Sequence, residues 1–160
     1  MSRYHMNKQD REITNPQIME EIIRRGKYAV IALCRDNEPY IVTLSYGYDP
    51  QKKALYFHTA QTGLKLDFIR TNPQACATVI EDCGYIMGEC AHGYRSVVLY
   101  GKIVVVDGLA EKKQGMKVML QHLEEDPRPV RKRSLKDDQA YARAAILRLD
   151  IEEMTGKSGQ

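Results

Sequence analysis

The sequence predicts one mostly β domain, an antiparallel barrel of six strands with three peripheral helices. Six segments rich in β-branched and aromatic residues are joined by short turns, which is typical of small barrels. The first three follow one another directly, and such successive strands pair antiparallel. The 160 residues have the length of a single domain, 1–160. Only its ends, 1–13 and 158–160, are expected to be flexible.

The first helix is expected to begin after Asn15, because asparagine caps helices and Pro16 suits a first helical turn. Gly26 ends it. The apolar residues on its inward face are Ile18, Met19, Ile22 and Ile23. Three successive strands follow at 27–35, 40–49 and 54–59, separated by polar turns.

The second half of the chain begins with a short helix at 64–70, which Asn72-Pro73 ends. Two further strands, a long amphipathic helix and a last strand are expected at 74–82, 94–107, 110–125 and 144–154. The second of these strands contains Gly101, where a bulge or barrel corner is expected. The inward residues of the long helix are Met116, Met119, Leu120 and Leu123.

The composition excludes membrane-spanning and nucleic-acid-binding classes. The longest apolar run, 28–34, is far shorter than the ~20 residues that a membrane helix needs. The polar N-terminus lacks the apolar stretch of a secretory signal, so a cytoplasmic protein is expected. The net charge of +3 is too small for a nucleic-acid partner, whereas an anionic small molecule remains compatible.

The cysteines Cys34, Cys76, Cys83 and Cys90 are too few to staple a chain of this length, so they are expected to be buried thiols without a disulfide. A metal site that includes Cys90 and His92 is conceivable. However, the paired spacing of structural zinc ligands is absent. Cys76, Cys83 and Cys90 are each seven residues apart, and seven residues of strand span about 23 Å. No metal is expected.

The most basic segment, 128–136, has two interpretations. It could dock an anionic molecule such as NAD(P)H or another nucleotide. Alternatively, it is a solvated loop between the long helix and the last strand, which is the usual role of a charge run. The loop is the favoured interpretation, and the aromatic residues that single-stranded nucleic acid needs for stacking are missing.

The segment 56–67 has the outline of a phosphate site. A strand ends in Thr59, a glycine at Gly63 lets the backbone approach a ligand, and a helix then begins whose N-terminus favours an anion. Thr62 can donate a hydrogen bond, and Lys65 can supply positive charge. Taken alone, the same pattern also fits a simple helix cap.

Several motifs together resemble a known family. The segment HTAQTGLKLDFIRTNP at 58–73 follows two paired strands and precedes YRSVVLYGKIVVVD at 94–107 and a terminal MTGKSG. Their order is similar to that in the flavin-binding split-barrel superfamily of pyridoxamine 5'-phosphate oxidase, and closest to its nitroimidazole-resistance (Nim) proteins. The resemblance covers about 14–158. It implies a six-stranded antiparallel split barrel that forms a homodimer and binds FMN at the subunit interface.

The resemblance also implies roles for individual residues. The flavin ring would be lined by Val42, Thr43, Leu44 and Ser45. The phosphate would be held by Thr59, Ala60, Thr62, Gly63 and Lys65. A second strand pair, from the other subunit, would contribute Tyr94, Arg95 and Ser96, and Gly156-Lys157 would close the site near the phosphate.

His58 precedes the predicted phosphate loop, and Nim-like proteins carry a histidine there on the substrate side of the flavin. It is therefore a candidate catalytic proton donor or substrate anchor, because imidazole titrates near physiological pH. The alternative is a structural histidine that hydrogen-bonds to backbone at the strand end. Both interpretations remain open.

The resemblance implies an FMN-dependent oxidoreductase that takes electrons from a reduced donor such as NAD(P)H. A small-molecule acceptor, such as a nitroaromatic compound, would receive them. The alternative is a module that holds a flavin or haem for storage, sensing or electron relay without turnover. No GxGxxG nicotinamide motif is present, which favours the module, although small flavin enzymes also stack nicotinamide directly on the ring.

Overall fold

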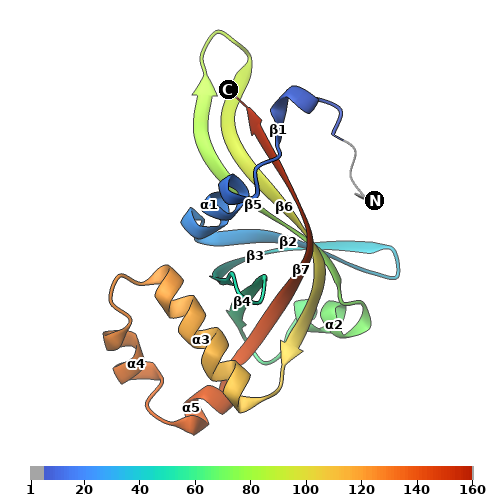
Figure 1. The fold of residues 1–160 in the computed structure, drawn as a ribbon. Helices are drawn as coiled ribbons and strands as arrows, with labels where there is room; N and C mark the ends of the chain where they lie inside the picture. The colour runs from blue at the N-terminus through green and yellow to red at the C-terminus, as the bar shows by residue number, and fades with distance from the viewer. Residues whose placement is uncertain (1–5, 160) are drawn as a thin grey trace.

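The computed structural model describes residues 6–159, and six of its strands close into a barrel (Figure 1). They are β2 (Tyr28–Arg35), β3 (Glu38–Asp49), β4 (Ala54–Thr59), β5 (Gln74–Ile86), β6 (Ala91–Val106) and β7 (Ala145–Gly159). Their order around the ring is β7-β4-β3-β2-β5-β6, and a β6–β7 pairing closes it. All pairings are antiparallel, which confirms the predicted fold class.

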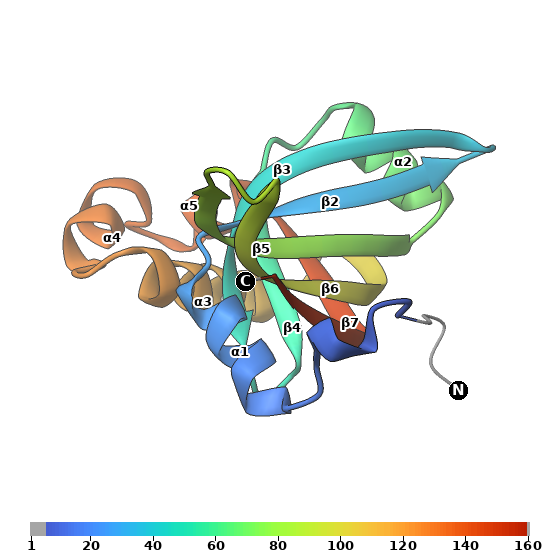
Figure 2. The same cartoon turned by 90° about the horizontal axis from the view of Figure 1, so that it is seen from above.

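Two helices pack against the barrel core from opposite sides (Figures 1 and 2). Helix α1 (Pro16–Arg25) starts at the predicted cap, where the Asn15 side chain accepts a hydrogen bond from the Gln17 N–H at 2.9 Å. It buries Met19, Ile22 and Ile23. Helix α2 (Leu64–Thr71) buries Leu66, Phe68 and Ile69 in the same core. Both helices lie where the sequence predicts them.

Helix α3 (Leu109–Leu123) covers the outer face of β3 and β4 and forms a second core. There Tyr56 and Ile146 pack under Met116 and the other predicted inward residues of the helix. The helix backbone lies so close that a Cβ on Gly47 would be 2.5 Å from backbone atoms of Met119. Glycine is therefore required at this point of β3.

Two short helices, α4 (Arg128–Ser134) and α5 (Asp138–Arg143), connect α3 to β7. The basic segment 128–136 is therefore mainly helical, not the expected loop. Half-buried Val130 and Leu135 pack against the second core, while its charged residues remain on the outside. Apolar anchoring at two positions is enough to order a helix within this charge run.

The ends of the chain are paired over more residues than expected. A short strand β1 (Glu12–Ile13), preceded by the 3₁₀-helix η1 (Gln9–Arg11), pairs with β7 at Lys157 and Gly156. Ile13 is buried in the barrel core, which gives this pairing an apolar anchor. At the other end, Ser158 and Gly159 pair with β6. Of the predicted flexible ends, residues 1–5 and 160 lie outside the described residues.

Gly101 lies at the predicted irregularity, where the register between β6 and β7 shifts. A Cβ there would lie 1.8 Å from the carbonyl oxygen of Asp150, so no side chain fits. The cysteines, in contrast, are not buried. Cys34 is exposed on β2, Cys76 is half-buried on β5, and the two others, at the β5–β6 hairpin, are exposed; all four are free thiols. Outward strand positions and a hairpin tip place them outside the core.

Helices of residues 6–159 do not combine the length and the apolar character that a membrane crossing requires.

Candidate functional site

Strands β3 and β4 diverge at the position where the predicted site begins. Tyr46 and Phe57 form the last matched pair on this side, so Ser45 and His58 are the first residues beyond the split. From Glu38 to Ser45, β3 pairs only with β2. Its other edge is open among the described residues. This open edge is the first component of the candidate site.

Backbone groups along β3 point alternately toward β2 and away from it. The hydrogen bond from the Tyr46 N–H to the Lys27 carbonyl oxygen, 3.3 Å long, shows that Tyr46 points toward β2. Backbone groups of Val42 and Leu44 therefore point toward β2, while those of Thr43 and Ser45 point to the open edge. The side chains alternate as well. Val42 and Leu44 pack against the barrel core, whereas Thr43 and Ser45 are exposed. Of the four residues predicted to line the flavin ring, only Thr43 and Ser45 have both an exposed side chain and backbone groups that point to the open edge.

The predicted phosphate loop follows directly. Thr59 is buried and pairs with Ala145, and the next four residues are exposed. Gly63 has a φ of 135° and is the N-cap of α2, with no side-chain hydrogen bond to the cap. No threonine side chain therefore caps this helix. Helix α2 presents an uncapped positive N-terminus, with Lys65 half-buried in its first turn.

The second group of predicted site residues, which consists of Tyr94, Arg95, Ser96 and Lys157, lies on β6 and β7. Ser96 pairs with Lys157, Arg95 with Ser158 and Tyr94 with Gly159. Arg95 is committed to carboxylates, because it forms an ion pair with Glu81 and a longer one of 3.9 Å with Glu21. Its hydrogen bond holds the pKa of Glu81 below the usual range and raises the pKa of Arg95 itself. These carboxylates, rather than an open groove, occupy its guanidinium.

The two groups are far apart within one chain. Thr59 lies beside Ala145 at the start of β7, and Ser96 lies beside Lys157 near its end. At about 3.3 Å per residue, roughly 40 Å of strand separates these positions. Figure 1 shows β7 running from the α5 end of the molecule to the opposite end. One chain therefore does not bring the two groups together.

An apolar outer sheet face connects them. We define it by Tyr28, Ile41 and Ile80, which are 60%, 65% and 56% exposed. The registers Tyr28↔Ser45 and Ile80↔Ser96 place this face on the same side of the sheet as Ser45 at the open edge and Ser96 of the second group. Large exposed apolar residues gathered on one face are characteristic of an interaction surface.

His58 points to the outer side of β4 and is exposed. It lines a cavity of about 430 Å³ between β4 and the helices α3, α4 and α5. No hydrogen bond joins it to another described residue, so the structural alternative of a histidine bonded to backbone does not describe this side chain. The loop beside it is tied to α5, because the Gln61 side-chain amide donates to the carbonyl oxygen of Arg143.

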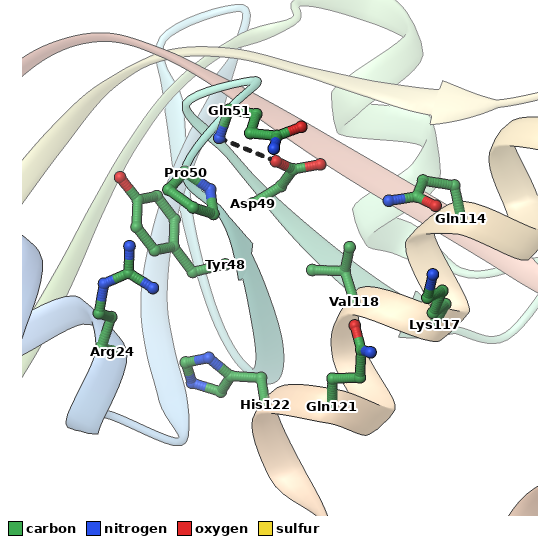
Figure 3. Close-up of a pocket in the computed structure, with 10 residues that line it drawn as sticks. All are labelled: Arg24, Tyr48, Asp49, Pro50, Gln51, Gln114, Lys117, Val118, Gln121 and His122. Atoms are coloured by element: carbon green, nitrogen blue, oxygen red, sulfur yellow. Dashed lines mark hydrogen bonds between the residues drawn. The ribbon is translucent and has the colours of Figure 1, made fainter.

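A second cavity, of about 540 Å³, lies between α1, the β3–β4 turn and α3 (Figure 3). Several of its polar groups contact other groups of the protein. Asp49 accepts from the Gln51 N–H at 3.0 Å, and Arg24 lies 5.5 Å from the Tyr48 ring centre. The His122 ring is 2.6 Å from the Gly26 carbonyl oxygen, and burial lowers its pKa. The sequence carries no signal for this cavity, because its walls come from distant segments.

Within residues 6–159, no three histidine, cysteine or acidic side chains gather as metal ligands.

Comparison with known proteins agrees with this fold. Among solved structures, the chain is similar to a Bacteroides thetaiotaomicron protein to which 5-nitroimidazole antibiotic resistance is attributed. The two are 22% identical with a TM-score of 0.74, over 92% of this chain and 86% of that one. The FAD and haem binding protein of Mycobacterium smegmatis is 17% identical with a TM-score of 0.76, over 94% of this chain and 74% of that one.

A curated protein of uncharacterised function from Rhizobium meliloti is 30% identical over 60 residues, which is only 38% of this chain and 38% of that protein. The family model described as pyridoxamine 5'-phosphate oxidase matches far more, residues 15–158. Because this match spans nearly the whole chain and the barrel has the expected topology, the protein belongs to the pyridoxamine 5'-phosphate oxidase family.

Proposed function

We propose that this protein binds FMN between two subunits and acts as an oxidoreductase on a small-molecule acceptor. The split between β3 and β4 carries the proposal. It places the open edge at Thr43 and Ser45 beside a loop that leads into an uncapped helix N-terminus. An isoalloxazine ring needs hydrogen-bond partners along one edge, and a phosphate favours a helix N-terminus with a lysine. The residues present fit both parts of FMN.

The separation of the two residue groups supports the proposed homodimer. Thr59 and Lys65 lie at one end of the barrel, and Ser96 and Lys157 lie at the other. A second copy, packed on the apolar outer sheet face, would supply the missing group to each site. It would also cover Ile41 and Ile80, whose exposure favours burial in an interface.

Bound FMN would supply hydride or electron transfer between a reduced donor, such as NAD(P)H, and the acceptor. This chain's residues would bind and orient it. Thr62 and Lys65 would hold the phosphate, Thr43 and Ser45 would hold the ring edge, and His58 would donate a proton on the acceptor side. The similarity to the Bacteroides protein supports a nitroaromatic acceptor.

The second candidate function is a non-catalytic flavin or haem module. The similarity to the Mycobacterium smegmatis protein, which binds FAD and haem, favours it. The two functions are separated by mixing the purified chain with FMN and NADH or NADPH without oxygen. An oxidoreductase bleaches the flavin absorbance faster than free FMN does. No acceleration with either donor favours the module. The spectrum and mass of any co-purified molecule identify the cofactor.

A further inference from the structure

The cavity beside His58 has the walls of a site for an apolar molecule. Its apolar lining includes Met116, Met119, Leu120, Leu123, Val130 and Leu135. Helix α3 supplies the first four, Val130 lies in α4 and Leu135 directly follows α4, while α5 adds Ala140 and the outer side of β4 forms the floor. A volume of about 430 Å³ lies within the range of small-molecule sites. Methionine and leucine walls adapt to flat aromatic bodies.

Three side chains with hydrogen-bond donors, His58, Ser134 and Arg143, also line this cavity. Neither His58 nor Arg143 has a side-chain hydrogen bond or an ion pair within residues 6–159. The protein commits other arginines to carboxylates: Arg95 binds Glu81, Arg128 binds Asp126 at 2.8 Å, and Arg148 binds Asp150 at 2.7 Å. A guanidinium left without a carboxylate at the rim of an apolar cavity is available to an external anion.

The charges around the rim also favour an anion. Helix α4 carries Arg131, Lys132 and Arg133. The nearby acids are engaged, because Asp137 caps α5 by accepting from the Ala140 N–H at 2.9 Å and Asp138 pairs with Lys113 at 2.6 Å. The rim therefore attracts negative charge. The basic segment, whose role the sequence leaves open, thus becomes part of the roof and the rim of this cavity.

We propose that this cavity binds a small aromatic monocarboxylate, with Arg143 gripping the carboxylate and the apolar walls holding the ring. One guanidinium matches one carboxylate, whereas a phosphate dianion favours several charged donors, and Arg143 is the one permanently charged side chain of this lining. His58 leaves β4 where Ser45 leaves β3, so the cavity adjoins the open edge proposed for the flavin. That the bound molecule is the electron acceptor rests on the proposed function. The binding itself does not.

The test compares 4-nitrobenzoate with nitrobenzene, which lacks the carboxylate. Binding to the full chain is measured by calorimetry, both as purified and after saturation with FMN. We expect 4-nitrobenzoate to bind more tightly than nitrobenzene. Arg143→Gln should weaken 4-nitrobenzoate by about ten- to a hundredfold and leave nitrobenzene unchanged, because only the charge-assisted hydrogen bond is lost.

Arg133→Gln is the matched control, because it removes the same charge from the neighbouring helix without touching the lining. Because Arg133 would act on the ligand only through its screened charge at the rim, this change should weaken 4-nitrobenzoate by at most about threefold. Ala140→Phe places a ring inside the cavity and should abolish binding of both compounds. Circular dichroism of each variant verifies that the fold persists.

Equal affinity for the two compounds, or equal losses from Arg143→Gln and Arg133→Gln, would overturn the inference. So would undiminished binding to a folded Ala140→Phe variant. If FMN fails to bind while the Arg143-dependent affinity for 4-nitrobenzoate remains, the proposed function fails and the cavity assignment stands. If FMN binds and 4-nitrobenzoate does not, only the cavity assignment fails.

Discussion

Replacing Lys65 with alanine tests the phosphate end of the proposed flavin site. Lys65 lies half-buried in the first turn of α2, next to an N-terminus that no side chain caps. Its ammonium would meet only the phosphate, so the variant should weaken FMN and spare riboflavin. Loss of a charge-assisted hydrogen bond costs about 1.5–3 kcal/mol, or roughly ten- to a hundredfold in affinity. Because Lys65 is partly solvated, we expect the lower part of this range.

Titration of the protein with FMN and with riboflavin, followed by flavin fluorescence, measures both dissociation constants. Arg70→Ala is the matched control, because it removes one positive charge from the last turn of the same helix. The expected result is a loss specific to FMN and specific to Lys65. Equal losses for both ligands, or an equal loss from Arg70→Ala, would refute the phosphate assignment.

Three further changes test other parts of the molecule. His58→Ala should leave the FMN affinity within a few fold of that of the unchanged protein and slow turnover of the acceptor by ~10²–10⁴, because a general acid acts on the rate and not on cofactor binding. Normal turnover per bound flavin would refute a catalytic role for His58. Ile41→Lys places a charge on the apolar outer sheet face, so light scattering should report a monomer that binds FMN weakly; an unchanged dimer mass would exclude this face as the interface. Burial favours the protonated form of Glu111, but hydrogen bonds from Arg148 and Tyr56 more than offset it and hold its pKa low. Its stabilising contribution is therefore present at neutral pH and is lost as the pH falls through this lowered pKa, below the usual range of glutamate. Melting temperatures of Glu111→Gln should consequently fall less on acidification than those of the unchanged protein; parallel curves would contradict this coupling.

Local signals in the sequence were sufficient to predict most of the barrel. Asn15 and Pro16 mark the start of α1, and Gly101 marks the irregularity opposite β7. Helix α4 was missed because a charge run with prolines hides the two apolar residues, Val130 and Leu135, that anchor it. Strand β1 has only two residues and depends on β7, which is distant in the sequence. Such elements form through tertiary contacts rather than local propensity.

The candidate site likewise has features that the sequence predicts and features that it does not. The loop from Thr59 to Lys65 could be placed from its motif, because a strand end, a glycine and a helix start are contiguous in the sequence. The inward orientation of Val42 and Leu44 depends on which face of β3 is buried, and the commitment of Arg95 depends on Glu81 of another strand. The cavity that includes Arg143 requires four elements to be assembled. These features follow from packing, which a local pattern does not encode.

The open edge of β3 also bears on solubility. An unpaired strand edge can recruit a strand from another molecule and so start aggregation. The alternation along β3 directs the backbone nitrogen of Pro39 toward this edge, and proline has no N–H to donate there. Glu38, paired with Arg35 at 3.4 Å, adds a charge at the same end. The start of the strand is thereby protected from unwanted pairing. The backbone groups that stay open are those of Ile41, Thr43 and Ser45, where an occupant of the site would cover them.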